Sequence, residues 1–301
     1  MPPLPPGNVR SGVPLAPFTT WRIGGPAQYL AEPGLDEIPA LLAWAQSAAL
    51  PVWVIGRGSN ILIDDAGLPG LVLLLRNTLQ DVRREGDFLV TGAGVSLPRL
   101  AKAAAAEGYA GFEFFIGIPG TVGGAVFMNA GFGPGDPRDT KALLHSVDLI
   151  LPDGSRETRA AEALHLAYRK SDLQLIPDGA ERPLVVGACF VLSQPGDQAT
   201  IRDETRRHLQ ERKEKQPLTR PTAGSVFRAS DGIPAAIHIQ QAGLKGHRIG
   251  DAMVSLKHAN WIENVGHATA SDVRRLIADI IDTVHFRAGI HLFPEVRILP
   301  P

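Results

Sequence analysis

Apolar and polar residues are spaced along the chain in short segments that predict a mixture of helices and strands. Helical spacing marks five segments, which begin at residues 36, 96, 197, 233 and 271: DEIPALLAWAQSAA, SLPRLAKAAAAEG, DQATIRDETRRHLQERKEKQP, IPAAIHIQQAGLKG and SDVRRLIADIIDTVHFRAG. Asp36, Ser96 and Ser271 are the expected N-caps, because their side-chain oxygens can accept from free backbone amides at a helix start.

Runs of β-branched and other apolar residues predict strands at PVWVI, LVLLL, DFLVTGAG, LVVGACFVLS and HLFPEVRIL. The segment SVDLILPDGSRET predicts a hairpin that turns at Asp153-Gly154. Because strands and helices follow no strict βαβ rhythm, the sequence favours an α+β fold in two parts. The proline-rich residues 1–17 predict a loose arm, and the charged helix from residue 197 predicts a boundary between the parts.

Charge and composition restrict the class of function. The 301 residues carry a formal net charge of −1, so neither nucleic-acid binding nor membrane insertion is expected. The lone Cys189 fits a reducing compartment and is best interpreted as a small buried hydrophobe. No secretion signal or membrane span is evident, which predicts a cytoplasmic protein. The nine histidines lack metal-ligand spacing, so no metal is expected.

Two glycine-rich loops are the main candidates for ligand binding. GRGSN, residues 56–60, follows a predicted strand, and successive amides in such a turn suit phosphate oxygens. It matches neither the dinucleotide fingerprint nor the P-loop, and a tight turn without a ligand is an equal alternative. GIPGTVGGAVFMNAG, residues 117–131, is interpreted either as backbone that a ligand approaches or as a close-packed turn before a helix. One ligand with phosphates and flat rings could use both loops.

Eight motifs in order from residue 18 resemble the UDP-N-acetylenolpyruvoylglucosamine reductase family, flavoproteins of bacterial cell-wall precursor synthesis. The motifs are FTTWRIGG, VIGRGSNILI, GIPGTVGGAVFMNAGFG, AYRKSDL, PTAGSVFR, QAGLKG, SLKHANWIEN and LFPEVRI. The resemblance implies a two-lobed FAD-binding domain of the vanillyl-alcohol-oxidase/PCMH type over residues 18–196, divided near 75. It also implies a smaller α+β substrate-binding domain over 197–301, whose last strand (291–299) returns toward the active site.

The resemblance implies that both loops hold FAD, with its pyrophosphate on backbone amides. The implied contacts are Gly56, Arg57, Gly58, Ser59, Asn60, Ile118, Pro119, Gly120, Thr121, Gly123, Gly124 and Ala125. GRGSN contains neither His nor Cys, so non-covalent FAD is expected, with NADPH as co-substrate.

The reaction that the resemblance implies reduces an enolpyruvyl ether of a UDP-sugar, with hydride passing from flavin N5 to the enol-ether carbon. Arg169 would hold the substrate carboxylate with its planar fork of donors. Glu295 would lie on the other side of that group, either protonated or polarising a donor. Ser225 would donate the proton to carbon, although a hydroxyl needs activation for this and a turn serine is the ordinary interpretation.

Further side chains are candidate substrate contacts: Tyr168, Lys245, Lys257, His258 and Asn260, with Arg220 a weaker one. The chain departs from the family after the serine motif, where FRASDG has Ala229-Ser230 in place of the usual Asn-Pro. The short distance in sequence from Ser225 to Glu295 indicates the compact form, without an inserted tyrosine loop, and an open active-site mouth. Two alternatives are an FAD-dependent oxidase of the same fold and a non-catalytic flavin- or nucleotide-binding module.

Overall fold

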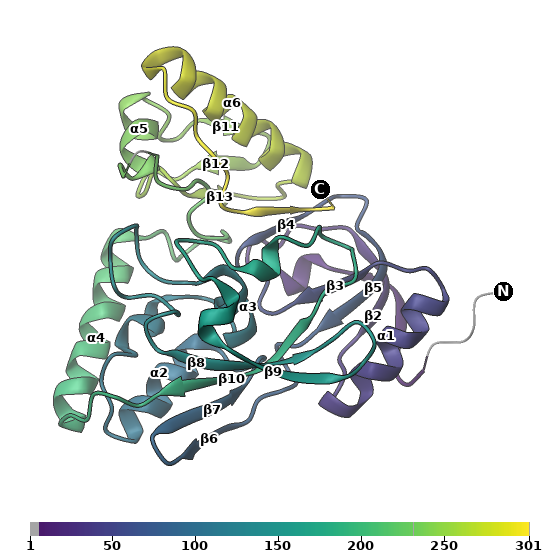
Figure 1. Cartoon of the computed structure of the whole chain (residues 1–301). Helices are drawn as coiled ribbons and strands as arrows, with labels where there is room; N and C mark the ends of the chain where they lie inside the picture. Colours follow the sequence, from purple (N-terminus) through teal and green to yellow (C-terminus); the bar gives the residue numbers. More distant parts are fainter. Residues whose placement is uncertain (1–5, 231, 301) are drawn as a thin grey trace. The chain divides into compact units, whose positions relative to one another are not determined.

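The computed structural model describes residues 6–230 and 232–300, and the chain folds into two compact units (Figure 1). Among the described residues, the first unit contains residues 6–12, 28–57 and 69–211, and the second contains the rest. Helices and strands are mixed throughout, which confirms the α+β fold class. Residues 13–27 and 58–68 belong to the second unit, whereas the domain boundary at residue 196 stays a prediction.

A four-stranded sheet forms the first part of the fold, in the order β1-β2-β5-β3. Its strands are β1 (Arg10–Pro14), β2 (Pro26–Ala31), β3 (Val52–Ile55) and β5 (Leu68–Leu74), and α1 (Ile38–Ser47) connects β2 to β3. β3 and β5 run parallel, as expected for strands joined through a longer connection. The expectation of a loose arm is wrong for Arg10–Pro14, because this segment pairs as β1 and Arg10 forms an ion pair with Glu32.

A five-stranded antiparallel sheet follows, in the order β6-β7-β10-β8-β9 (Figure 1). Its strands are β6 (Val82–Glu85), β7 (Phe88–Gly92), β8 (Leu144–Ile150), β9 (Arg156–Ala160) and β10 (Leu184–Val191). β8 and β9 confirm the predicted hairpin at Asp153-Gly154. The edge strand β6 has the sequence VRRE with mostly exposed side chains, so it gave no apolar signal in the sequence.

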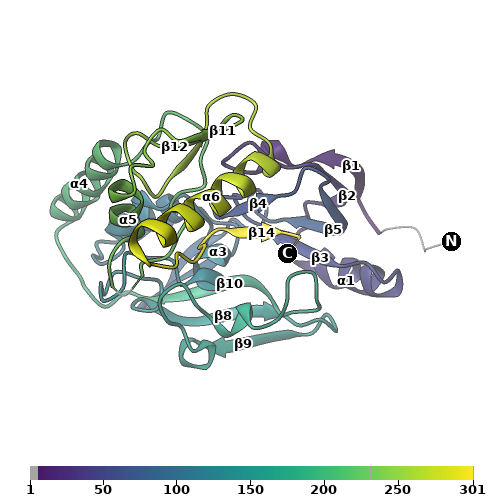
Figure 2. The same ribbon diagram turned by 90° about the horizontal axis from the view of Figure 1, so that it is seen from above.

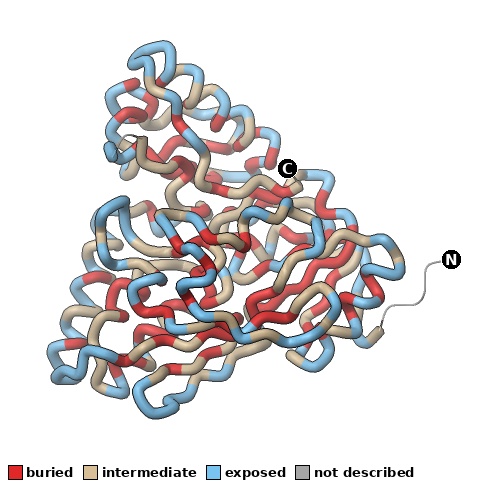
Figure 3. Tube along the Cα trace, in the orientation of Figure 1, coloured by how far each residue is buried: buried red, intermediate tan, exposed pale blue. Residues whose placement is uncertain are grey.

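Apolar side chains from this sheet and two helices form the largest core of the first unit. The helices are α2 (Leu97–Ala106) and α3 (Val122–Met128), and α3 contacts β7 and β10. The core includes the fully buried Phe115, Val126 and Phe190. Figure 3 shows this buried interior beside the largely exposed α4 (Gln198–Lys215), where only Ile201 and His208 are buried. The exposed face of α4 agrees with its charged sequence.

The second unit has its own core, built around a long helix (Figure 2). β11 (Arg248–Ile249), β12 (Ala252–Val254) and β13 (Ile262–Asn264) form a small sheet, and β4 (Ile61–Ile63) pairs in parallel with β14 (Arg297–Leu299). The helix α6 (Ala270–Ala288) packs on β11, β12 and α5 (Ala235–Gln241). The strand predicted over 291–299 is therefore shorter in the structure.

The helix N-caps differ from those expected. Thr269 caps α6 in place of Ser271, because its hydroxyl accepts from the Asp272 amide at 3.0 Å and the Asp272 side chain returns a bond to the Thr269 amide. Asp36 lies in a short 3₁₀ turn before α1, so Glu37 occupies the cap position. Ser96 has the backbone of an N-cap, but its side chain makes no capping bond.

Candidate functional site

The start of the first glycine loop, at Gly56, lies against the second glycine loop within the first unit. A Cβ atom built on Gly56, at the end of β3, would come 2.4 Å from Oγ1 of Thr121. Thr121 is the N-cap of α3, and its Oγ1 accepts from the Gly124 amide at 3.4 Å. Since that spacing leaves no room for a side chain at position 56, contact with the second loop accounts for this glycine.

The first loop has the properties of an anion site. The amides of Arg57, Gly58, Ser59 and Asn60 donate no hydrogen bond to any residue that the structure describes. Gly58 has φ +62°, a left-handed conformation of the kind found in anion-binding backbone turns, and a Cβ atom there would come 2.3 Å from the Phe18 carbonyl oxygen. Burial lowers the pKa of Arg76 and the nearby charge of Arg57 lowers it further, which places two guanidinium groups close to this loop. The free amides and the two guanidinium groups together suit the negative charge of a diphosphate.

Most backbone amides of the second loop are already bonded, so a ligand would contact this loop mainly through its exposed surface. The amides of Ile118, Gly120, Val122 and Gly123 all donate to backbone carbonyls. A Cβ on Gly123 would lie 3.1 Å from that of Ala93, so tight packing on the turn after β7 favours this glycine. Gly124 is exposed, Pro119 and Gly120 are half-buried, and Ala125 is buried in the core. Residues 118–125 therefore form a close-packed turn that is partly exposed, and its contact with a ligand stays a prediction.

Replacing Gly56 with alanine is expected to lower the free energy of unfolding by about 1–3 kcal/mol, because the new methyl group overlaps Thr121. Thr121→Ala alone should cost about 1 kcal/mol through its lost cap. The double variant should be more stable than the sum of the two losses, by about 1 kcal/mol, since Thr121→Ala removes the clashing atoms. Urea unfolding of the four proteins measures this coupling, and strictly additive losses would show that the loops do not touch.

Arg169 lies at the end of the second glycine motif. Its NH2 group donates to the Gly131 carbonyl at 2.8 Å, and its guanidinium carbon lies 5.1 Å from the centre of the Tyr168 ring. Both residues are half-buried. Within the first unit, the second glycine motif therefore contacts Gly56 through Thr121 and Arg169 through Gly131.

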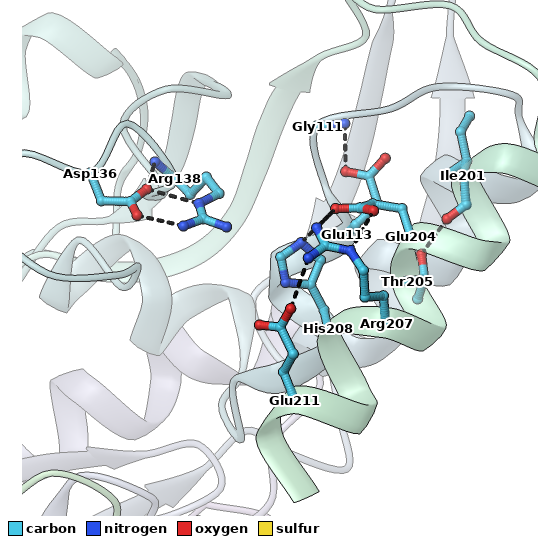
Figure 4. Close-up of polar contacts among 10 residues, drawn as sticks. All are labelled: Gly111, Glu113, Asp136, Arg138, Ile201, Glu204, Thr205, Arg207, His208 and Glu211. Atoms are coloured by element: carbon cyan, nitrogen blue, oxygen red, sulfur yellow. Dashed lines mark hydrogen bonds and ion pairs between the residues drawn. The ribbon is translucent and has the colours of Figure 1, made fainter. Parts of the chain in front are cut away.

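The loop that follows Gly131 is anchored on α4. The Arg138 guanidinium lies 4.3 Å over the Phe132 ring, and that ring lies 6.2 Å from the imidazole of His208. Figure 4 shows the paired hydrogen bonds from Arg138 to Asp136, which hold the pKa of Asp136 at about 2. His208 is buried and contacts Glu204 on the same helix. This packing fixes the segment that accepts the hydrogen bond from Arg169.

Ser225 and Glu295 occupy neighbouring backbone segments of the second unit. The Val226 carbonyl accepts from the Glu295 amide at 2.7 Å, and Ser225 pairs with Trp261 on its other side. The Ser225 hydroxyl makes no hydrogen bond to the described residues, so it is available to a ligand. Asn60 of the first glycine loop also reaches this segment, because its side-chain amide lies 3.4 Å from the Glu295 carbonyl.

Asn260 holds the backbone near Ser225, and its predicted contact with the substrate stays a prediction. Its side chain is buried, with Oδ1 accepting from the Phe227 amide at 2.9 Å and Nδ2 donating to the Phe227 carbonyl at 2.8 Å. The Asn260 carbonyl accepts from the Val226 amide. Asn260 therefore clamps the backbone that carries Ser225.

The basic candidates of the second unit fall into two groups. Burial lowers the pKa of His258, and the charge of nearby Lys245 lowers it further. Lys257 instead donates to the Lys213 carbonyl at 2.6 Å. Lys257 and Arg220 line a hollow of about 400 Å³ together with apolar side chains, and Arg220 contacts Glu263.

Sequence reasoning did not find several residues that shape the site. Arg76 beside the first loop had no distinguishing motif, and the capping role of Thr121 depends on a contact with a residue far away in sequence. Within the described residues, no group of His, Cys, Asp and Glu side chains could hold a metal ion. No helix of the described chain combines the length and apolar character needed to cross a membrane.

A profile of the FAD binding domain matches residues 27–158, which places the chain among FAD-binding proteins. A profile of the C-terminal domain of UDP-N-acetylenolpyruvoylglucosamine reductase matches residues 216–299. The chain is 44% identical to the reductase of that name from Synechococcus sp. (strain JA-3-3Ab), with 97% of this chain and 92% of that protein covered. The Synechococcus sp. (strain WH7803) protein of the same name is 46% identical, over 97% and 94%.

The crystal structure of UDP-N-acetylenolpyruvylglucosamine reductase from Thermus caldophilus has the same fold. It superposes with a TM-score of 0.79 at 33% identity, covering 97% of this chain and 98% of that one. The chain therefore belongs to the UDP-N-acetylenolpyruvoylglucosamine reductase family, as the motifs predicted. It is an FAD oxidoreductase of peptidoglycan precursor synthesis, with a flavin-binding domain of the PCMH type.

Proposed function

We propose that this protein reduces UDP-N-acetylglucosamine enolpyruvate to UDP-N-acetylmuramate, with NADPH as reductant and FAD as bound cofactor. The observation that carries the proposal is the hydrogen bonding between the Ser225 and Glu295 segments. These two residues are 70 positions apart in the sequence, and the fold brings their hydroxyl and carboxyl groups onto adjacent backbone segments. Membership of the reductase family supports the same reaction.

The cofactor is held by both glycine loops in this proposal. The free amides of residues 57–60 bind its diphosphate, and Pro119, Gly120 and Gly124 offer a surface with few side chains. When bound, FAD supplies the two-electron chemistry that transfers a hydride from NADPH to the substrate. Tyr168, Lys245, Lys257 and His258 contact the UDP-sugar.

The side chains of this chain handle the charge and the proton. Arg169 binds the substrate carboxylate through two parallel N–H bonds and stabilises the negative charge that spreads into it. Glu295 lies on the other side of that group. The Ser225 hydroxyl donates the proton to the carbon next to the carboxylate. Activation of this hydroxyl falls to the ligand and the neighbouring charges, because the described residues give it no hydrogen bond.

Incubation with NADPH and the enolpyruvyl ether tests the reaction. The expected result is one NADPH consumed for each substrate, with a product heavier by two hydrogen atoms in mass spectrometry. An absence of substrate-dependent NADPH consumption would support the alternative of a flavin- or nucleotide-binding module.

Non-covalent binding of FAD is a separate expectation. The loop segments 56–60 and 117–131 contain no His or Cys that could form a covalent bond to the flavin. Acid or denaturant should therefore release all of the yellow colour into the supernatant after the protein is precipitated. Colour that stays with the precipitated chain would favour the oxidase.

A further inference from the structure

Arg169 has an unusual backbone conformation for an arginine. Its φ of 54° lies in the left-handed region, where side chains with a Cβ are disfavoured. His165 and Asn129 share this conformation, with φ of 44° and 43°. Such a conformation persists only where surrounding contacts hold it, which raises the question of what holds the short loop from Ala167 to Lys170.

Gln174 makes the most direct connection. Its Nε2 group donates to the Phe127 carbonyl at 2.7 Å and to the Arg169 carbonyl at 3.3 Å. Phe127 lies in α3, within the second glycine motif. One carboxamide therefore joins the backbone of Arg169 to the helix that Thr121 caps. The Ser171 hydroxyl, which is fully buried, donates to the same Phe127 carbonyl at 2.7 Å.

Asn129 holds the other end of the loop. Its Nδ2 group donates to the Ala167 carbonyl at 3.0 Å and to Asp139 at 2.9 Å, and its Oδ1 accepts from the Lys141 amide at 2.9 Å. The Ala167 and Lys170 backbones close the loop with two bonds of 3.0 Å. The loop is thus fixed at Ala167 by Asn129 and at Arg169 by Gln174.

We propose that Gln174 is a positioning residue, which orients Arg169 by tying its carbonyl group to the glycine-motif helix. The proposal rests on the proposed function, in which Arg169 binds the substrate carboxylate. Both carbonyl groups that face Gln174 are acceptors, so position 174 needs a donor. A glutamine keeps two N–H donors at every pH, and this requirement distinguishes its role from simple packing.

The substitution Gln174→Glu tests this need for a donor. An ionised carboxylate at 174 would repel the two carbonyl oxygens, whereas a protonated carboxyl group can donate to one of them; its pKa should therefore be raised. We expect kcat/KM for the enolpyruvyl substrate to fall about 10–100-fold at pH 8 and to recover partly as the pH is lowered to 5.5. Reduction of the flavin by NADPH should keep its wild-type rate.

Gln174→Met is the comparison variant, since it has a similar shape and no donor at any pH. It should show the same loss with no recovery at low pH. The charged groups around position 174 are Arg169, Arg182 over the Phe127 ring, and Asp172 with its partner His165; they are common to both variants. Gln198→Met is the matched control, because it removes a 2.7 Å bond to the Ala106 carbonyl on an exposed surface and should leave activity unchanged.

Hydrogen exchange of the Ala167 and Lys170 amides gives a readout that does not depend on activity. Exchange should be faster in Gln174→Met than in wild type and in Gln198→Met. Wild-type exchange in Gln174→Met, or a Gln174→Glu profile parallel to that of wild type, would overturn the positioning role. If the proposed function is wrong, the wild-type protein will not turn over the substrate. The hydrogen-exchange measurement would still decide the role of Gln174 in that case.

Discussion

The Ser225→Ala variant is expected to be reduced by NADPH at the wild-type rate and to be reoxidised by the enolpyruvyl substrate about 10²–10⁴-fold more slowly. The reason is that only the second half-reaction needs a proton delivered to carbon. The Ser225 backbone is fixed by pairing with Trp261, and the adjacent Val226 bonds to Asn260 and Glu295, so loss of the hydroxyl should not move the segment. Anaerobic stopped-flow absorbance of the flavin measures the two steps separately.

Ser271→Ala is the matched control for this experiment, because Ser271 is an exposed serine of the same unit outside the proposed machinery. It should leave both half-reactions unchanged. Equal losses in the two half-reactions of Ser225→Ala would show that the hydroxyl supports the fold or cofactor binding, and the assignment as proton donor would be wrong.

Arg169→Ala should produce a loss of about 10²–10³-fold in the reoxidation step and a higher KM for the substrate. The guanidinium binds the carboxylate in the ground state, and its interaction strengthens as negative charge develops there. Arg169→Lys should recover little of this loss, because an ammonium group keeps the charge without the planar pair of donors. The hydrogen bond to the Gly131 carbonyl would also be lost.

Lys170→Ala is the control for the arginine variants, since Lys170 is the exposed neighbouring cation in the same loop. It should behave as wild type in both steps. Full activity of Arg169→Lys would mean that a positive charge is sufficient at this position. An unchanged substrate KM in Arg169→Ala would contradict the role in binding the carboxylate.

Much of the fold was predictable because local pattern and long-range packing agree. The strands β3, β7 and β10 and the helices α2, α4 and α6 were all found from apolar or charged spacing. The errors occur where partners distant in sequence decide the structure. β6 is a charged edge strand that pairs only with β7. β14 is limited to three residues because the preceding segment, at Phe293 and Glu295, bonds to the backbone of Arg228 and Val226.

The candidate site was predictable in part through its motifs. The contact of Gly56 with Thr121 and the bond between Arg169 and Gly131 show that motifs separated in sequence meet in the first unit. Sequence could not show that most second-loop amides are already bonded, or that Asn260 clamps Phe227. These assignments depend on which donors and acceptors the folded chain leaves unpaired, which no single segment determines.

The central claim is that bound flavin transfers electrons from NADPH to the enolpyruvyl ether. The most direct measurement follows flavin absorbance near 450 nm, a region typical of oxidised flavins, in purified protein without oxygen. One equivalent of NADPH should bleach the yellow colour, and one equivalent of UDP-N-acetylglucosamine enolpyruvate should then restore it with formation of UDP-N-acetylmuramate. A flavin that stays bleached after the substrate is added would contradict the account.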